Sequence, residues 1–258
     1  MKNLDESIAG AMDCDDIALV PWLPYILQDF YEIGSSASRI LFIVKENTTD
    51  HASLRVLDLG CGKGAVSIRL AADLGCSCRG IDAIPEFIEE ARRRAGEEDV
   101  AERCEFSAGD ARVLVKNLGL YEVIILGSIG PVFGDYLGTL TLLQKNLAPR
   151  GIIILDDGYL DEETDVQHDT AMKKRELLAQ VRQSGMEMIQ EYIDTDTETF
   201  EEYDKEFSFL QKRCNELAEK YPEKRNLFLG YVQKQREEYA FLENSCICST
   251  MVLSRVKV

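Results

Sequence analysis

Short apolar runs alternate with segments of helical periodicity along most of this chain. The apolar runs predict strands at 55–59, 77–81, 104–107, 122–126, 152–155, 186–193 and 246–256. Segments with apolar residues three and four positions apart predict helices at 64–74, 85–95, 111–117, 135–147 and from about 165 to 184. Because strands and helices alternate, we expect an α/β protein with a doubly wound, mostly parallel sheet covered by helices on both faces.

The first 50 residues carry helical patterns that are interrupted near Pro21 and Pro24. A spacing of three and four predicts one amphipathic helix with five apolar residues on its buried side: Trp22, Tyr25, Ile26, Phe30 and Ile33. We therefore divide the chain into an N-terminal helical cap, 1–50, and a main domain, 51–258. Two interpretations of the cap stay open, a helix that packs on the sheet and a lid that contacts the ligand.

A further helical pattern separates the last two predicted strands, at about 195–244. Its seam positions are three and four residues apart on both sides of Pro222: Phe200, Tyr203, Phe207, Leu210, Cys214, Leu217 and Tyr221, then Phe228, Val232, Gln235, Tyr239 and Leu242. This spacing predicts an inserted helical hairpin whose two helices bury the seam against each other. The surface of the hairpin outside this seam has two possible roles that stay open, a homodimer contact and a substrate contact.

The charge balance narrows the possible partners. The 258 residues include 29 Lys plus Arg and 46 Asp plus Glu, a net charge of −17, which repels nucleic acid. No apolar run approaches the roughly 20 residues that span a bilayer, and the N-terminus lacks the layout of a secretory signal. We expect a cytoplasmic protein with no nucleic-acid or membrane partner.

Eight cysteines are scattered along the chain without a small-domain disulfide framework. We expect free thiols in a reducing compartment. The pairs Cys76 and Cys78, and Cys246 and Cys248, have a spacing that soft metal ions use. Each pair falls within a predicted strand, where a free cysteine packs as a small apolar side chain. Core packing is therefore the favoured interpretation, and we predict no metal site.

The most informative segment is 55–64, with the sequence Arg-Val-Leu-Asp-Leu-Gly-Cys-Gly-Lys-Gly. Its glycines permit a tight turn and a bare backbone against a ligand, and a predicted helix starts directly behind them. We expect Gly60, Cys61 and Gly62 to line a ligand site. A dinucleotide fingerprint has the spacing G-x-G-x-x-G and holds a pyrophosphate. Here Asp58 precedes the first glycine by two residues, which disfavours a pyrophosphate and suits an ammonium group.

Three other predicted strand ends carry residues suited to the same site: Asp82 with Ala83, Asp110 with Ala111, and Gly127 with Ser128. In an open α/β sheet, ligands bind beyond the carboxyl ends of the strands. A single acid at a strand end suits a helix cap. Acids at three successive strand ends, Asp58, Asp82 and Asp110, favour ligand binding. S-adenosylmethionine fits this set, with its ammonium near Asp58, its ribose near Asp82 and its adenine near Asp110.

At these positions the sequence resembles class I S-adenosylmethionine-dependent methyltransferases of the small-molecule type. Residues 56–64 resemble the first family motif, 80–82 the second, 108–111 the third and 147–151 a later turn. The resemblance implies a Rossmann-like sheet of seven strands in the order 3-2-1-4-5-7-6, with the last strand antiparallel. It also implies that the cofactor pocket is lined by the residues named above, with the transferred methyl group near the end of the fourth strand.

The segment 127–131 reads Gly-Ser-Ile-Gly-Pro, which departs from the Asn/Asp-Pro-Pro-Tyr/Phe signature of methylation on nucleobases or glutamine. A small-molecule acceptor is therefore expected, and the acidic stretches 156–163 and 194–206 favour an amine or another cation. A base is needed only when the acceptor arrives protonated, and its candidates are weak: Asp135, Asp156, Asp157, Tyr159 and His168.

Two other functions stay open at this point. One is regulation by a protein that binds S-adenosylmethionine without transferring its methyl group. The other is aminopropyl transfer from the decarboxylated cofactor, which is disfavoured because Asp58 would then lack its ammonium partner.

Overall fold

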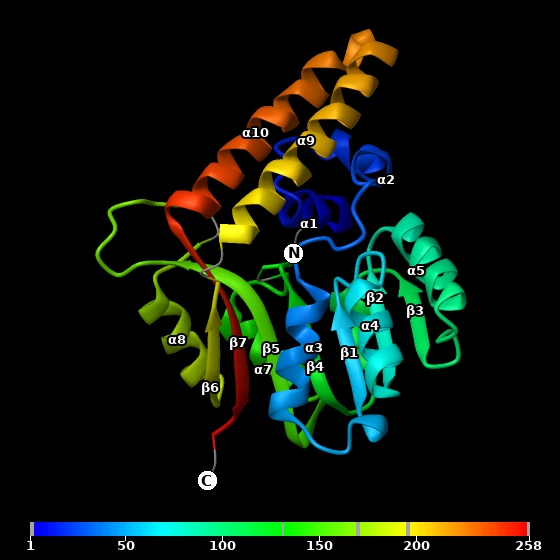
Figure 1. Ribbon diagram of the computed structural model, residues 1–258. Coiled ribbons are helices and arrows are strands. Elements are labelled where there is room, and N and C mark those ends of the chain that lie inside the picture. Colours follow the sequence, from blue (N-terminus) through cyan, green and yellow to red (C-terminus); the bar gives the residue numbers. More distant parts are fainter. Residues whose placement is uncertain (1–2, 131, 169–170, 195–196, 257–258) are drawn as a thin grey trace.

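The computed structural model describes residues 3–130, 132–168, 171–194 and 197–256, with the backbone alone for 197–202. Within these residues, seven strands form one sheet in the order β3-β2-β1-β4-β5-β7-β6 (Figure 1). The strands are β1 (Arg55–Leu59), β2 (Ser77–Asp82), β3 (Cys104–Ala108), β4 (Tyr121–Gly127), β5 (Leu147–Leu160), β6 (Met186–Ile193) and β7 (Cys246–Arg255). Neighbours are parallel except that β7 runs antiparallel to β5 and β6. The predicted fold class and strand order are confirmed.

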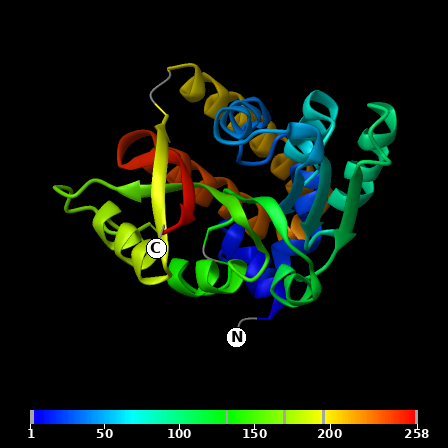
Figure 2. The same ribbon diagram turned by 90° about the horizontal axis from the view of Figure 1, so that it is seen from below.

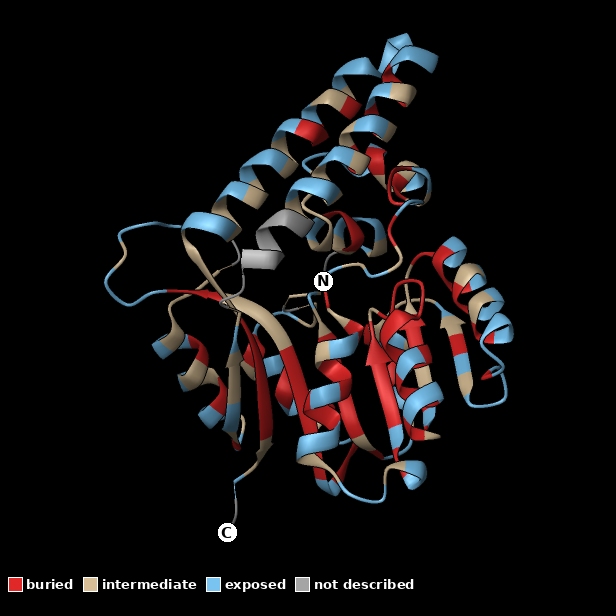
Figure 3. Cartoon of the chain, in the orientation of Figure 1, coloured by how far each residue is buried: buried red, intermediate tan, exposed pale blue. Residues whose placement is uncertain are grey.

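Helices cover both faces of the sheet (Figure 2). One face carries α3 (Ala37–Asn47), α4 (Ala65–Leu74) and α5 (Pro85–Glu97), and the other carries α6 (Ala111–Leu114), α7 (Tyr136–Leu143) and α8 (Lys174–Gln183). Successive strand side chains alternate between the two cores, so Val56 and Leu57 are both fully buried on opposite faces. Burial on both faces explains why the strands are continuous apolar runs (Figure 3).

The predicted helical hairpin is confirmed and extends beyond the carboxyl ends of the strands (Figure 1). It consists of α9 (Thr197–Lys220), the short 3-10 helix η4 (Pro222–Lys224) and α10 (Arg225–Asn244). The N-terminal elements α1 (Leu4–Ala11), η1 (Ile17–Trp22) and α2 (Leu23–Ile26) pack against it. Its seam is therefore shared, because Leu23, Ile26 and Phe228 are all fully buried in one core. A homodimer through the hairpin stays a prediction, and the Phe200 side chain lies outside the described residues.

The amphipathic helix predicted across 22–33 is wrong. Helix α2 ends at Ile26, and residues 27–36 form a loop that leads into α3. The Lys63 ammonium donates to three carbonyl groups in this loop, between residues 27 and 30. The Leu27 carbonyl also accepts from the Phe30 N–H at 3.1 Å, a bond of a tight turn and not of an α-helix. The apolar spacing marked the buried side chains correctly but not their backbone conformation.

Two other predicted boundaries also move. The helix predicted from about residue 165 begins at Lys174, because the preceding backbone runs beside β5, where the Leu160 N–H donates to the Met172 carbonyl at 2.9 Å. Strand β5 extends far beyond the predicted 152–155, since it pairs with β7 as far as Leu160. Because β5 begins at Leu147, the turn that the resemblance implied at 147–151 lies within this strand.

The shared core of the hairpin and the N-terminal elements should contribute strongly to stability. Phe228 is fully buried there, and its ring meets the Trp22 ring edge to face at 5.2 Å. We expect Phe228→Ala to lower the free energy of unfolding by about 3–5 kcal/mol, measured by urea denaturation. Phe42→Ala is the matched control, because Phe42 is 52% exposed on α3. Equal losses in the two variants would contradict this role of the core.

Candidate functional site

The loop after β1 turns through three glycines in the left-handed region, at positions 60, 62 and 64, with φ values of 72°, 51° and 79°. Its N–H groups are used within the protein. Those of Gly60 and Cys61 donate to the Ile81 carbonyl on β2 at 2.8 and 3.1 Å, and that of Gly64 donates to the Cys61 carbonyl at 2.8 Å. The expectation of bare N–H groups for a ligand is therefore wrong at these positions. The loop does not offer the donors that a phosphate group needs.

Asp58, the acid before the loop, is almost fully buried, with 3% exposure. The Ser67 hydroxyl on α4 donates to Asp58 Oδ2 at 2.7 Å. Burial raises the pKa of the Asp58 carboxyl to about 6, although the bond from Ser67 acts in the opposite direction. A buried carboxylate of this kind gains free energy from a cation that comes to lie beside it.

Asp82, at the end of β2, holds the next element of the site. Its two carboxylate oxygens accept hydrogen bonds from the N–H groups of Gly62 and Ile84, at 2.9 and 2.8 Å. Burial raises the pKa of this carboxyl, and the backbone donors partly offset that shift. Each oxygen keeps lone-pair capacity for a further donor, such as a hydroxyl group. Ala83 follows directly and leads into α5.

Asp110 lies at the end of β3 beside Asp82, because the Gly109 N–H donates to the Asp82 carbonyl at 2.8 Å. Its carboxylate caps α6, which begins at Ala111, and forms an ion pair with Arg112 at 2.8 Å. The hydrogen bonds from Arg112 lower the pKa of Asp110. The structure thus places all three predicted acids at adjoining strand ends, with Asp110 already paired.

Gly127 and Ser128 close the opposite side of the site at the end of β4. Ser128 adopts φ of 51°, a strained value for serine, and its N–H donates to the Asp156 carbonyl at 2.9 Å. Its hydroxyl lies 3.4 Å from that of Ser35. A side chain at Gly127 would place its Cβ 2.6 Å from Ser35 Oγ, so the loop before α3 presses directly on this strand end.

A small cavity of about 20 Å³ lies between these strand ends, room for about one water molecule. Its lining joins the predicted positions to the loop before α3: Tyr31, Ile33, Ser35, Asp58, Gly60, Cys61, Ala65, Val66, Ile125 and Gly127. The open interpretation of the N-terminal cap as a lid included Tyr31 as a ligand contact, but the sequence did not predict Ile33 or Ser35 as neighbours of Asp58. The only local signal was the turn chemistry of Gly34 and the serines that follow it.

Three of the five candidate bases make contacts elsewhere. Asp135 is exposed and caps α7 through the Gly138 N–H at 2.7 Å. Tyr159 is buried and donates to Glu191 Oε1 at 2.9 Å. His168 stacks on the Phe241 ring of the hairpin, with ring centres 4.0 Å apart.

Asp156 and Asp157 lie at the strand end beside Ser128. Thr250 donates to Asp156 Oδ1 at 2.6 Å, and the Tyr136 hydroxyl donates to Asp157 Oδ2. Burial raises the pKa of both carboxyl groups. Asp156 is paired with Gly127 across β4 and β5, so both acids lie beside the end of β4, and as consecutive strand residues they point to opposite faces of the sheet.

Other kinds of site have less support. In the described ranges, no group of three or more His, Cys, Asp or Glu residues is arranged to hold a metal ion. Cys76 and Cys78 are buried in the core, as predicted, with their sulfur atoms 3.7 Å apart, whereas Cys246 and Cys248 are half-buried. No helix among the described residues has the length and apolar character of a membrane span.

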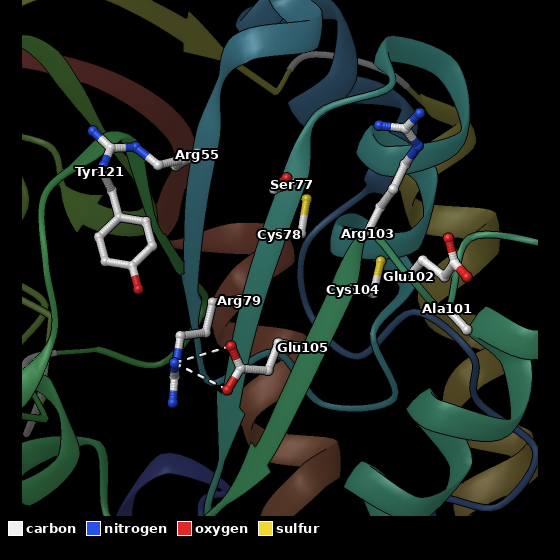
Figure 4. A pocket seen from close by; sticks show the side chains of 10 residues that line it. All are labelled: Arg55, Ser77, Cys78, Arg79, Ala101, Glu102, Arg103, Cys104, Glu105 and Tyr121. Carbon is white, nitrogen blue, oxygen red and sulfur yellow. Dashed lines mark hydrogen bonds and ion pairs between the residues drawn. The ribbon is translucent and has the colours of Figure 1, made fainter.

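A larger recess, of about 410 Å³, lies at the opposite end of the strands (Figure 4). It opens near the starts of β1, β2 and β3, where Arg79 forms an ion pair with Glu105 at 3.0 Å. Arg55 on its rim is likewise paired with Glu122 at 2.7 Å. The recess is thus separate from the acids at the carboxyl ends, and these two cations are already neutralised.

Comparison with known proteins shows the family of this chain. The sequence model described as "Methyltransferase domain" matches residues 50–244. Among curated proteins, an uncharacterised protein of Escherichia coli K12, YjhP, is 35% identical over 105 residues, which cover 41% of this chain and 42% of YjhP. A probable tocopherol O-methyltransferase of Oryza sativa is 28% identical over 168 residues, covering 59% of this chain and 46% of the relative. The matches thus span less than half of these relatives.

Solved structures extend the likeness to nearly the whole fold. A methyltransferase from Geobacter sulfurreducens, solved in complex with S-adenosylhomocysteine, has a TM-score of 0.75 at 20% identity, covering 91% of this chain and 97% of that one. At this identity the likeness shows the fold alone, and the family match carries the assignment. Because that match spans most of the chain, this protein belongs to the methyltransferase-domain family and has the class I methyltransferase fold.

Proposed function

We propose that this protein transfers the methyl group of S-adenosylmethionine to a small-molecule acceptor. One observation carries the proposal: the site presents buried carboxylates, while the loop N–H groups at 60–62 are used internally. Such a site suits a ligand rich in donors, with an ammonium group and a ribose diol, and disfavours a pyrophosphate. S-adenosylhomocysteine in the related Geobacter structure supports the same cofactor class.

The residue types at the site fit this cofactor. Asp58 would hold its ammonium group, Asp82 its ribose hydroxyls, and Asp110 with Ala111 its adenine, while Gly127 with Ser128 would border the methyl group. The cavity of about 20 Å³ lies beside Asp58 and Gly127, and neither Asp82 nor Asp110 lines it. We propose that the loop at 31–35 moves outward when a cofactor held at Asp82 reaches Asp58.

When bound, S-adenosylmethionine supplies an electrophilic methyl group on a sulfonium, so the protein has mainly to orient the acceptor and exclude water. An acceptor that arrives protonated also needs a base. Asp157 is our candidate, since burial raises the pKa of its carboxyl and the Tyr136 hydroxyl orients it.

We infer that the acceptor is a small amine or another cation. The chain has a net charge of −17, which favours the approach of cations. Aromatic rings at the base of the hairpin can bind a cation through their faces, and Tyr203 and Tyr239 lie there with ring centres 5.4 Å apart. The Tyr239 hydroxyl donates to Glu206 at 3.1 Å, which adds a carboxylate to this cluster.

Asp82→Ala should weaken binding of S-adenosylhomocysteine about 100-fold, because hydrogen bonds from two ribose hydroxyls to a carboxylate are lost. Calorimetric titration measures the dissociation constant, and thermal melting checks that the variant is folded. Asp165→Ala is the control, since Asp165 is exposed in the loop before α8. Unchanged affinity in a folded Asp82→Ala protein would refute the assignment of Asp82.

Cofactor affinity should also depend on pH through Asp58. Only the ionised carboxylate attracts the ammonium group, so affinity is full above the Asp58 pKa of about 6 and falls as the pH drops through it. Between pH 7 and pH 5 the dissociation constant should rise about tenfold. Asp58→Asn should bind weakly at both pH values and respond less, with the remaining response due to Asp82. An equal response in both proteins would contradict the role of Asp58.

A panel of small amines, alcohols and carboxylic acids tests the activity itself. We expect release of S-adenosylhomocysteine with at least one amine, and a loss of about 100-fold or more in kcat for Asp157→Asn if the acceptor arrives protonated. Tight cofactor binding without turnover across the panel would instead support a binding protein.

A further inference from the structure

Lys63 lies in the middle of the glycine loop, residues 60–64, but its side chain leaves this loop and contacts the N-terminal segment, by which we mean residues 17–36. Its ammonium donates to the carbonyl groups of Leu27, Gln28 and Phe30, at 2.6, 3.2 and 2.5 Å. The residue is only 5% exposed, and burial lowers the pKa of this ammonium to about 8. All three donors of the ammonium are therefore used on one short stretch of backbone.

The same stretch of backbone is bound to the hairpin on its other side. Asp29 forms a two-pronged ion pair with Arg213 of α9, with distances of 2.6 and 2.8 Å. The Phe30 ring meets the Phe209 ring edge to face at 6.4 Å. Residues 27–30 thus connect the glycine loop directly to α9.

The loop end of this connection reaches the ligand site. Gly62, next to Lys63, donates its N–H to Asp82 at 2.9 Å. Beyond residue 30, the same N-terminal segment supplies Ile33 and Ser35 to the lining of the cavity beside Asp58. A ligand that binds at Asp82 therefore acts on the loop that carries Lys63. A ligand that displaces residues 31–35 acts on the chain directly after the backbone that Lys63 holds.

We propose that Lys63 is a positioning residue that couples occupancy of the cofactor site to the placement of the N-terminal segment and the hairpin. This proposal rests on the proposed function, since S-adenosylmethionine is the ligand concerned. Lys63 holds residues 27–30 against the glycine loop, and α9 follows because Asp29 and Phe30 are bound to it. The hairpin wall of the acceptor site is thereby set by the loop that contacts the cofactor.

A purely structural role for Lys63 would give a different result. Lysine donors often satisfy carbonyl groups at the end of a helix, and α2 ends at Ile26, just before these carbonyls. Such a cap would stabilise the segment equally with and without ligand. Coupling requires in addition that the ligand changes the environment of the segment through Lys63.

Trp22 is the only tryptophan of the chain and lies in the N-terminal segment. Its ring contacts Tyr221 and Phe228 of the hairpin, with ring centres 4.9 and 5.2 Å apart. The Lys224 ammonium lies 4.8 Å from the centre of the Trp22 ring. Its fluorescence therefore reports the fit between the segment and the hairpin.

The first experiment needs no ligand. Hydrogen exchange of the backbone amides at 23–36 is compared between wild type, Lys63→Met and the control Lys145→Met, in which an exposed lysine after α7 is changed in the same way. We expect exchange about tenfold or more faster in Lys63→Met and unchanged in Lys145→Met. Unchanged exchange in Lys63→Met would show that Lys63 does not hold the segment and would overturn the proposal.

The second experiment adds S-adenosylhomocysteine, with calorimetry for binding and Trp22 emission for the segment. In wild type, Trp22 emission should change as ligand is added, with the same dissociation constant that calorimetry gives. In Lys63→Met the ligand should still bind, while the change in emission falls at least about fivefold. A full emission change in Lys63→Met, or none in wild type that binds the ligand, would overturn the coupling.

The two proposals fail in different ways. Wild-type protein that binds no S-adenosylhomocysteine would overturn the proposed function and, with it, the coupling, while the exchange experiment would still decide whether Lys63 holds the segment. Should Lys63→Met fail to fold, Lys63→Arg serves in both experiments, because a planar guanidinium does not present three donors from one atom. Wild-type behaviour of a folded Lys63→Arg protein would then count against the proposal.

Discussion

The carboxylate of Asp82 is the contact on which the geometry of the site depends most. Its two oxygens bind the N–H groups of Gly62 and Ile84, and so one side chain joins the loop after β1 to the start of α5. The loop is folded onto β2 by these bonds and by those to the Ile81 carbonyl. The site therefore offers a ligand hydrogen-bond acceptors, the carboxylate oxygens of Asp58 and Asp82, and not backbone N–H donors. This distinguishes it from a phosphate-binding loop with similar glycines.

A second constraint comes from apolar burial outside the sheet. The hairpin cannot bury its seam by pairing α9 with α10 alone, and the N-terminal elements complete the core with side chains such as Leu23 and Ile26. The segment that follows must then pass over the carboxyl ends of β1 and β4 to reach α3. Its close approach at Ser35 leaves little free space beside Gly127, which is why we propose that cofactor entry and hairpin packing are linked.

Features that depend on residues close together in the sequence were predicted well, and features that depend on contacts between distant residues were not. The strands were predictable because burial on both sheet faces produces apolar runs, whereas their order was implied by the resemblance to the methyltransferases. The neighbouring positions of Asp58 and Asp82 were predictable because parallel strands end at one edge of the sheet. The helix predicted at 22–33 failed because its carbonyl groups are bound by Lys63, a contact no local pattern records. The loop N–H groups were assigned to a ligand for the same reason, since their partners on β2 lie about twenty residues away.

The direction of side chains along β5 bears on where a proton leaves the acceptor. Consecutive strand residues point to opposite faces, so Asp156 and Asp157 cannot serve one substrate atom together. Asp156 is bonded to Thr250, which is fully buried, and its carbonyl holds the Ser128 N–H, both structural tasks. Asp157 instead meets the Tyr136 hydroxyl at the start of α7, and burial raises the pKa of both groups. A tyrosine with a raised pKa keeps its proton and therefore orients Asp157 rather than competing with it. Under the proposed methyl transfer, Asp157 is the base that we propose, and the Tyr136 hydroxyl is the group that orients it.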